Sequence, residues 1–328
     1  MITYFVLILA IGLFLYVLLD GFDLGVGMLF GLTRNENLRQ QMLGAISPVW
    51  DGNETWLVLA GTILYAAFSA IYSILLSAFY IPLMMMLGAL ILRGVAFEFR
   101  YKTERGRWIW DTGFVGGSVL ATFMQGATVG ALVNGLPVAN LQFQGTSMDW
   151  LTPFSALCGI GLCLGYALLG AAWLILKTEH EIRDRAYILL PWLMMAVLMF
   201  LGAAFVYATA IHLQVMRQWF DRPALIVFPA LGAIGCAGLL YGMQARKDGL
   251  PFLSAAVIFL AAFGTMAASF WPYMLPYSIT IEQAASPPST LNFMFWGIGL
   301  IVFPLILIYN AGVYIVFHGK VDKHTQYH

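Results

Sequence analysis

The sequence is poor in charge and in cysteine. Charged residues make up 10% of its 328 residues and hydrophobic residues 61%, whereas a soluble domain has about 25% charged residues. The 16 basic and 16 acidic residues balance, so no basic face for nucleic acid is indicated. Cys158, Cys163 and Cys236 lie in apolar stretches without a CxxC motif, which argues against a disulfide framework or a thiolate metal site. The composition indicates an all-α polytopic membrane protein.

Histidine is also scarce. Haems in membranes are usually held by histidine, sometimes with methionine. Each of the five histidines falls in a loop, in the tail or near the end of an apolar run, so no two are expected to face each other inside the membrane. We therefore expect this chain alone to bind no haem and no metal. The histidines are His180, His212, His318, His324 and His328.

Long apolar runs predict nine membrane-spanning helices. A helix that crosses the hydrocarbon core needs about 20 mostly apolar residues. No basic residue precedes the first run and no A-x-A site follows it, so we interpret it as a membrane helix rather than a removed signal. The predicted spans are Tyr4–Phe30, two within Val49–Phe97, Trp110–Leu132, Pro153–Leu176, Ala186–Leu213, Pro223–Gln244, Leu250–Tyr273 and Thr290–Phe317.

The second and third spans are predicted from an uninterrupted run. Thr55–Leu92 holds 38 residues without a charge. As a helix it would extend for roughly 57 Å, nearly twice the roughly 30 Å hydrocarbon core. We therefore expect a hairpin of two spans with its turn near Ser69–Ser73.

The basic residues predict the orientation. With nine spans, one set of connecting segments holds every lysine and arginine except Arg93, Arg217 and Arg222. Positive residues concentrate on the cytoplasmic side. This places the N-terminus outside and the C-terminus in the cytoplasm.

Charged residues inside the apolar runs are the first functional candidates. A carboxylate at bilayer depth costs about 2.5–3.5 kcal/mol or more, so it is a functional hypothesis by default. In DGFDLGVGMLFG, residues 20–31, Asp20 and Asp23 share a helix face. The alternative is that each fixes helix packing. The same stretch holds two GxxxG pairs that favour close helix approach, namely Gly21 with Gly25 and Gly27 with Gly31.

A second acidic cluster opens the next span, in SPVWDGNETWLV, residues 47–58. Asp51 and Glu54 share a face, and Trp50 and Trp56 suit the interfacial aromatic belt. An acidic helix start matched to the helix dipole explains one acid, but not both with Asn53 and Thr55 beside them. We interpret the cluster as a proton entry, because carboxylates at this depth can bind and release protons.

Arg93 starts a third stretch, RGVAFEFRYKTERGRWIWD, residues 93–111. It lies inside a predicted span and can pair with a buried carboxylate. The residues Arg100 to Arg107 are interpreted as an ordinary positive cluster on the cytoplasmic side.

These motifs resemble subunit II of the cytochrome bd-type quinol oxidases, a group that includes the cyanide-insensitive oxidases. The resemblance rests on GFDLGVGML and PVWDGNETWLV, followed in order by RGVAFEFR, WDTGFVGGS, WPYMLP and STLN. It covers nearly the whole chain.

The resemblance implies a fold, an activity and partners. It implies two four-helix bundles, about residues 1–135 and 150–275, a peripheral last helix at about 289–318 and a cytoplasmic tail at 319–328. The partner, subunit I, would carry two b-type haems and one d-type haem in a bacterial inner-membrane complex that oxidises quinol and reduces O₂ to water, electrogenically. A structural quinone, a small single-helix accessory subunit and lipid contacts are left open.

The resemblance also implies residue roles. It places Asp51 and Trp56 at the cytoplasmic entrance of a proton path, with Asp20 and Asp23 as weaker candidates along it. Two alternatives stay open. A proton-coupled secondary transporter also uses buried acids and glycines, and a pure scaffold would use the acids for packing alone.

Overall fold

The protein is described here from a computed structural model that covers residues 1–103, 105–211, 219 and 222–321. Several sequence predictions fall outside these residues: the end of the Ala186–Leu213 span with His212, the basic residue Arg217, and the tail from 322 to 328 with His324 and His328.

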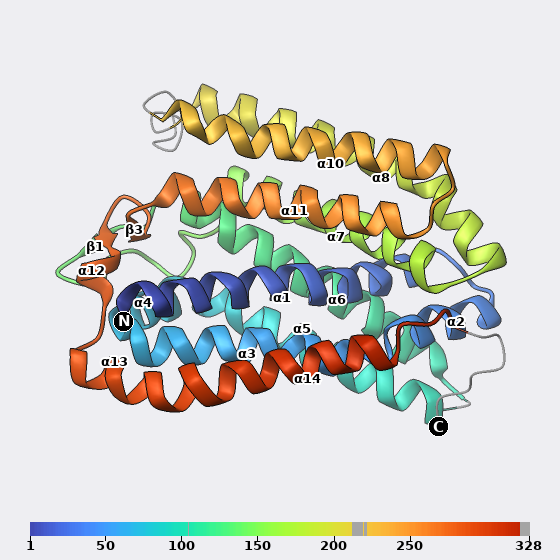
Figure 1. Cartoon of the computed structure of the whole chain (residues 1–328), viewed down its shortest axis with the longest axis horizontal. Helices are drawn as coiled ribbons and strands as arrows, with labels where there is room; N and C mark the ends of the chain where they lie inside the picture. Colours follow the sequence, from blue (N-terminus) through green and yellow to red (C-terminus); the bar gives the residue numbers. More distant parts are fainter. Residues whose placement is uncertain (104, 212–218, 220–221, 322–328) are drawn as a thin grey trace.

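Long helices make up almost all of the described chain (Figure 1). Eight of them are long and apolar enough to cross a membrane, and a bent pair raises the count to nine. The prediction of nine spans agrees with this upper count. The eight are α1 (Ile2–Phe30), α5 (Tyr80–Lys102), α6 (Arg107–Asn134), α7 (Pro153–Lys177), α8 (His180–Ala210), η1 with α10 (Pro223–Gln244), α11 (Gly249–Phe270) and α13–η2–α14 (Pro288–Val316).

The bent pair corrects the predicted hairpin turn. Helix α3 (Trp50–Ala67) ends at Phe68, and α4 (Ser69–Ala78) leaves it at an angle of 118°. The chain therefore turns sharply at Phe68, next to the predicted position, but Ser69 and Ser73 themselves lie in the helix that follows. Ile71, Ile74 and Ala78 are buried, so the apolar residues of α4 pack into the protein end instead of extending the span.

Helices α1 and α7 form the centre of the molecule. Helix α1 packs against α3, α6 and α7, while α7 also packs against α8 and α11. Pairs α5–α6 and α10–α11 complete the layers on either side, and α14 runs beside α3 at one edge (Figure 1). The small residues of α1 and α7 allow this close packing. Polar groups on α1 therefore lie deep inside the protein.

The two ends of the helix array differ. Helix α2 (Glu36–Ile46) lies at the end where α1 finishes, here called the α2 end, and begins at Asn35, whose side chain accepts from the Asn37 amide at 3.0 Å. The opposite end carries two antiparallel hairpins and the short α12 (Ile281–Ala284) (Figure 1). The hairpins pair β1 (Val138–Ala139) with β2 (Gln142–Phe143) and β3 (Tyr273–Leu275) with β4 (Ile279–Thr280).

The last span is interrupted by a π-helical segment. It begins as α13 (Pro288–Met294), continues as η2 (Phe295–Val302) and ends as α14 (Phe303–Val316). The Tyr4 hydroxyl of α1 donates to the Gly299 carbonyl oxygen at 2.8 Å. This contact joins the first span to the π-helical segment of the last.

Glycines set the spacing of α1 from its neighbours. A Cβ on Gly25 would lie 1.9 Å from the Tyr166 carbonyl oxygen of α7, and one on Gly27 would lie 2.1 Å from Ser118 Oγ of α6. A Cβ on Gly21 would meet the Tyr166 ring at 2.7 Å, whereas Gly31, at the end of α1, has Val115 at 3.2 Å. At Gly25 the two helix backbones approach too closely for any side chain, whereas at Gly21 and Gly27 the Tyr166 ring and the Ser118 side chain fill the space that a Cβ would need.

Candidate functional site

Three helices bring ionisable side chains together inside the protein. Arg93 of α5 donates from Nη1 to Asp20 Oδ1 of α1 at 3.1 Å and to Glu54 Oε1 of α3 at 2.9 Å. The Arg93 and Asp20 side chains are 1% and 0% exposed, and Glu54 is 28% exposed. A buried guanidinium paired with carboxylates avoids the penalty of an isolated buried charge. Asp20, Asp23, Glu54 and Arg93 are called the carboxylate cluster below.

Asp23 joins the cluster through an amide. Asn53 donates from Nδ2 to Asp23 Oδ2 at 2.7 Å, and the Tyr314 hydroxyl of α14 donates to Asn53 Oδ1 at 2.8 Å. Asp23 and Asn53 are both fully buried. The last span therefore contributes to the hydrogen bonds around the first.

A second polar branch, which begins at Tyr16 of α1, joins this helix to α6 and α7. Gln125 of α6 donates from Nε2 to the Tyr16 hydroxyl at 2.7 Å, and the Tyr166 hydroxyl donates to Gln125 Oε1 at 3.0 Å. Sequence reasoning missed this branch because single tyrosine and glutamine residues in apolar runs give no pattern.

Several polar atoms of the cluster are buried without a hydrogen-bond partner among the described residues. They are Asp20 Oδ2, Asp23 Oδ1 and Arg93 Nε. Buried polar groups are normally paired, so each unpaired atom requires an explanation. A carboxyl oxygen that has no fixed donor is free to take up a proton or a water molecule. The arrangement is therefore chemically suited to hold protons inside the protein.

Asp51 and Trp56 lie in different environments in the structure. Asp51 is exposed in the first turn of α3, one turn before Glu54. Trp56 is 1% exposed, so its assignment to the interfacial belt was wrong. Its indole lines a cavity of about 460 Å³ together with Tyr314 and Trp173. Its Nε1 has no partner among the described residues.

A second ionic cluster lies at the α2 end. Arg100, predicted to belong to an ordinary positive cluster on the cytoplasmic side, is only 1% exposed. It donates to Glu36 Oε2 at 2.8 Å and to Asp111 Oδ1 at 2.5 Å. Arg39 also reaches Asp111, at 2.6 Å, and Arg107 reaches Glu36, at 3.1 Å. These pairs tie α2 to the ends of α5 and α6.

The described residues contain no cluster of side chains suited to bind a metal ion. The two histidines among them, His180 and His318, are both exposed, at the start of α8 and just after α14. Within the described residues, no group of three or more histidine, cysteine or acidic side chains could hold a metal. No chemical step is therefore assigned to a metal in this chain.

Asp248, between α10 and α11, fastens the C-terminal segment. It accepts from Lys320 Nζ at 2.6 Å, from Arg183 Nε at 2.8 Å and from the Tyr187 hydroxyl at 2.9 Å. Burial raises the pKa of Asp248, but the hydrogen bonds from these three partners outweigh it and hold the pKa below its ordinary value. The segment is also held at Lys177, which donates to the Phe317 carbonyl at 2.6 Å.

Replacing Asp248 with asparagine is expected to release this segment. Folding lowers the pKa of Asp248. Its contacts therefore stabilise the fold at pH values above the ordinary pKa of about 3.9, and this stabilisation is lost as the pH falls through the lowered pKa. The loss of these partly exposed ion pairs is expected to reduce the free energy that holds the segment in place by about 1 kcal/mol, which raises the released fraction by a factor of about five. Limited proteolysis of the C-terminal tail at neutral pH measures this released fraction. Asp184→Asn, which breaks the exposed pair with Arg246, is the control; equal cleavage in both variants would contradict the assignment.

The sequence has clear relatives. A family model described as cytochrome bd terminal oxidase subunit II matches residues 1–317. Cytochrome bd-I ubiquinol oxidase subunit 2 of Escherichia coli (strain K12) is 31% identical over 351 residues, covering 94% of this chain and 92% of the relative. Cytochrome bd ubiquinol oxidase subunit 2 of Bacillus subtilis (strain 168) is 29% identical over 331 residues, covering 97% and 95%.

A solved structure shows the same fold. The bd oxidase from Geobacillus thermodenitrificans contains a chain that superposes with a TM-score of 0.72 at 17% identity, covering 95% of this chain and 99% of that one. At this identity the likeness concerns the fold alone. The family match, by contrast, spans nearly the whole sequence and includes every helix of the carboxylate cluster. The chain therefore belongs to the cytochrome bd terminal oxidase subunit II family.

Proposed function

We propose that this chain is the haem-free subunit of a quinol-oxidising, O₂-reducing complex and that its carboxylate cluster carries protons from the cytoplasm toward the haem-bearing subunit I. Two b-type haems and one d-type haem belong to that partner, and the reaction is electrogenic because its protons come from the cytoplasm. Family membership and the relatives' names support the quinol oxidase assignment. The carboxylate cluster supports the proton path.

One observation carries the proton path. Two carboxyl groups, Asp20 and Glu54, share a single guanidinium inside an apolar protein, and a third, Asp23, is buried one helical turn from Asp20. Asp20 and Asp23 each have an oxygen without a partner among the described residues. A structural role would need only one carboxylate for Arg93. Additional acids at this depth are costly, so their presence is explained by proton uptake and release.

The geometry gives the path an order. Exposed Asp51 receives protons at the α2 end, which is the cytoplasmic side by the distribution of basic residues. Glu54 follows one helical turn deeper and is partly exposed. Asp20 and Asp23 lie beyond it in the interior. Trp56 is buried two residues after Glu54 and lines the neighbouring cavity.

The remaining parts of the complex follow from the same assignment. Helices α1, α3, α5 and α6 form one four-helix bundle, α7, α8, α10 and α11 form the second, and the last span is peripheral. The cavity at Trp56 has an apolar lining and a few polar groups, which suits a structural quinone. Exposed apolar residues on α8, such as Trp192 and Phe205, face lipid or a small accessory subunit.

The test uses the intact complex in membranes. Glu54→Gln is expected to lower quinol-dependent O₂ uptake at least about tenfold, since a positioned proton-transfer group contributes about 10²–10⁴-fold, while the haem absorbance of the purified complex is unchanged. Glu181→Gln, on an exposed acid paired with Arg185, is the matched control. Normal turnover of Glu54→Gln with full haem content would refute the proton path, and normal turnover of Asp51→Asn would remove the entrance role of Asp51.

The transporter alternative has a separate test. It requires that vesicles containing this chain alone accumulate a substrate in response to a proton gradient. The oxidase assignment requires instead that the chain copurifies with a haem-containing partner.

A further inference from the structure

A chain of two hydrogen bonds joins the last span to an acid of the first span. We infer that Tyr314 is a positioning residue for the proton path: it fixes the Asn53 amide with its nitrogen toward Asp23, which leaves Asp23 Oδ1 as the oxygen that binds and releases the proton. The inference rests on the proposed proton path and deepens it. It names the oxygen that exchanges the proton and the residue that keeps this exchange reversible.

The contacts of Asn53 determine which way its amide points. Its Nδ2 lies 2.7 Å from Asp23 Oδ2 and 3.4 Å from the Leu19 carbonyl oxygen, and its Oδ1 lies 2.8 Å from the Tyr314 hydroxyl. A backbone carbonyl only accepts hydrogen bonds, so the amide nitrogen belongs on the side of Leu19 and Asp23. The Tyr314 hydroxyl is then the donor that satisfies the buried Oδ1.

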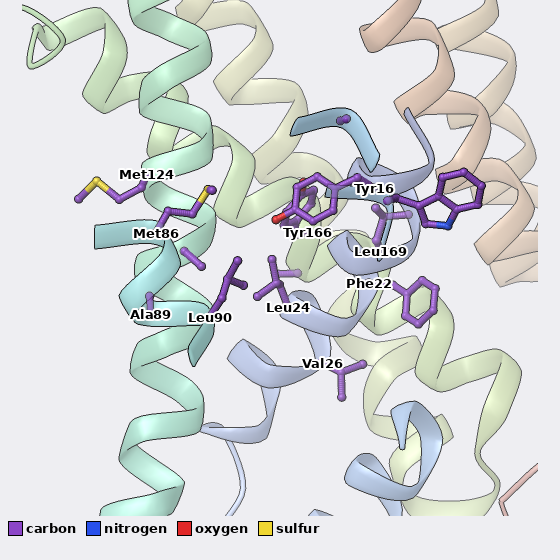
Figure 2. Close-up of a cluster of buried hydrophobic side chains, with 14 of the residues drawn as sticks. Tyr16, Phe22, Leu24, Val26, Met86, Ala89, Leu90, Met124, Tyr166 and Leu169 are labelled. Carbon is purple, nitrogen blue, oxygen red and sulfur yellow. The ribbon is translucent and has the colours of Figure 1, made fainter. Parts of the chain in front are cut away.

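Asp23 has apolar neighbours and forms no ion pair within the described chain. The guanidinium of Arg93 pairs with the two other acids of the carboxylate cluster. Phe22 and Leu24, on either side of Asp23 in the sequence, belong to the cluster of buried apolar side chains in Figure 2. An ionised carboxylate is costly in such surroundings, whereas a neutral carboxyl with a hydrogen bond is tolerated. Asp23 therefore holds a proton at rest and loses it only when the proton moves on.

The orientation of the amide determines how readily that proton leaves. With Nδ2 of Asn53 toward it, Asp23 Oδ2 accepts a hydrogen bond, and the proton binds Oδ1, which has no partner among the described residues. A hydrogen bond to the ionised form stabilises that form, which favours release. A reversed amide would present its oxygen to the Asp23 hydroxyl and retain the proton. Tyr314 opposes this reversal because its hydroxyl donates to the amide oxygen.

Aromatic packing holds the hydroxyl of Tyr314 in place. The Tyr314 ring meets the Trp173 ring edge-on, with 6.2 Å between the centroids, and Trp173 stacks on Phe22 of α1 at 4.0 Å. The Trp173 indole also donates to the Ala45 carbonyl oxygen at 3.0 Å. Trp173 therefore holds Tyr314 in a fixed position relative to the helix that carries Asp23.

The first test compares quinol-dependent O₂ uptake by the intact complex in H₂O and in D₂O. Tyr314→Phe removes the donor to Asn53 but keeps the ring. Turnover is expected to fall about three- to tenfold, the usual effect of losing one hydrogen bond. The ratio of the rates in H₂O and D₂O is expected to rise, because the proton leaves Asp23 more slowly. A packing role alone would leave this ratio unchanged.

Tyr309→Phe is the matched control for this test, because Tyr309 lies in the same helix and is exposed. It is expected to leave both the turnover and the rate ratio unchanged. A rate ratio in Tyr314→Phe equal to that of Tyr309→Phe would overturn the inference.

Infrared difference spectroscopy of the same complex reports the hydrogen bond at Asp23. Asp23→Asn is expected to remove a protonated-carboxyl band, and Tyr314→Phe is expected to move that band because the Asp23 carbonyl loses its amide donor. In an Asn53→Leu background, Tyr314→Phe is expected to move the band no further, since the amide through which it acts is gone. An unchanged spectrum in Asp23→Asn or in Tyr314→Phe would contradict the inference. If Asn53→Leu fails to assemble with its haems, the comparison of Tyr314→Phe with Tyr309→Phe decides.

The two proposals fail separately. If Glu54→Gln lowers turnover but Tyr314→Phe matches Tyr309→Phe in rate ratio and carboxyl band, the proton path stands and the role of Tyr314 is wrong. If Glu54→Gln and Asp23→Asn both leave turnover unchanged, the proton path is wrong and the role of Tyr314 falls with it.

Discussion

Replacing Arg93 with leucine is expected to prevent recovery of an assembled complex. Asp20 would keep its buried position without the guanidinium that lies 3.1 Å away, and Glu54 would lose its partner at 2.9 Å. Breaking a buried ion pair by removing one partner costs about 3–5 kcal/mol, a large share of the stability of most proteins. Thermal unfolding of the purified complex and its yield from membranes measure the effect.

The control separates charge burial from the simple loss of a basic residue. Arg34→Leu removes an exposed arginine near the same end of the protein and is expected to leave yield and unfolding temperature unchanged. Asp20→Asn combined with Arg93→Leu is expected to recover part of the stability, since the uncompensated carboxylate is then gone. A normal yield of Arg93→Leu would show that the cluster is not held together by this residue.

Adding a single methyl group at Gly25 is expected to separate the two central helices. The Cβ of Gly25→Ala would lie 1.9 Å from the Tyr166 carbonyl oxygen and 2.9 Å from the Gly170 amide nitrogen. Both neighbours are backbone atoms, so a rotamer change cannot relieve the overlap. Overpacking typically costs about 1–3 kcal/mol, occasionally more, and we expect a loss near the upper value. The drop in the unfolding temperature of the complex measures it.

Gly61 provides the matched glycine. It also lies in a long apolar helix, and no described atom outside its own helix lies within 4 Å of a Cβ placed there. Gly61→Ala is expected to be neutral or slightly stabilising, because alanine favours the helix over glycine by about 1 kcal/mol. Gly170→Ala adds a methyl group at the same crossing, so combining it with Gly25→Ala should cost less than the sum of both. Equal stability of Gly25→Ala and Gly61→Ala would contradict the close approach.

The spans and the acidic candidates could be predicted because charge and hydropathy are properties of single positions. Asp20, Glu54 and Arg93 interrupt apolar runs, and the structure places them on three helices that meet. The Tyr16 branch was not predictable in this way. Gln125 and Tyr166 are uncharged, and only the packing of α6 against α7 brings them together.

Two errors have a common physical cause. Trp56 was assigned to the membrane interface from its residue type, and Ser69–Ser73 to a turn from the length of an apolar run. Both predictions leave out the contacts that a helix makes with the rest of the protein. In the structure Trp56 faces the protein interior, and α4 packs its apolar side against the end of the molecule. Burial against other helices depends on tertiary contacts, which residue type and run length do not encode.

The wide turn in the last span determines which side of α14 faces α3. In η2 each amide bonds one residue further back than in an α-helix, so the segment accommodates a residue that a regular helix would not. Without that residue, everything after Val302 would rotate by about 100° around the helix axis. Tyr314 would then no longer point at Asn53. The π-helical segment η2 of the last span thus determines whether Asp23 on the first helix keeps its hydrogen-bonded neighbours.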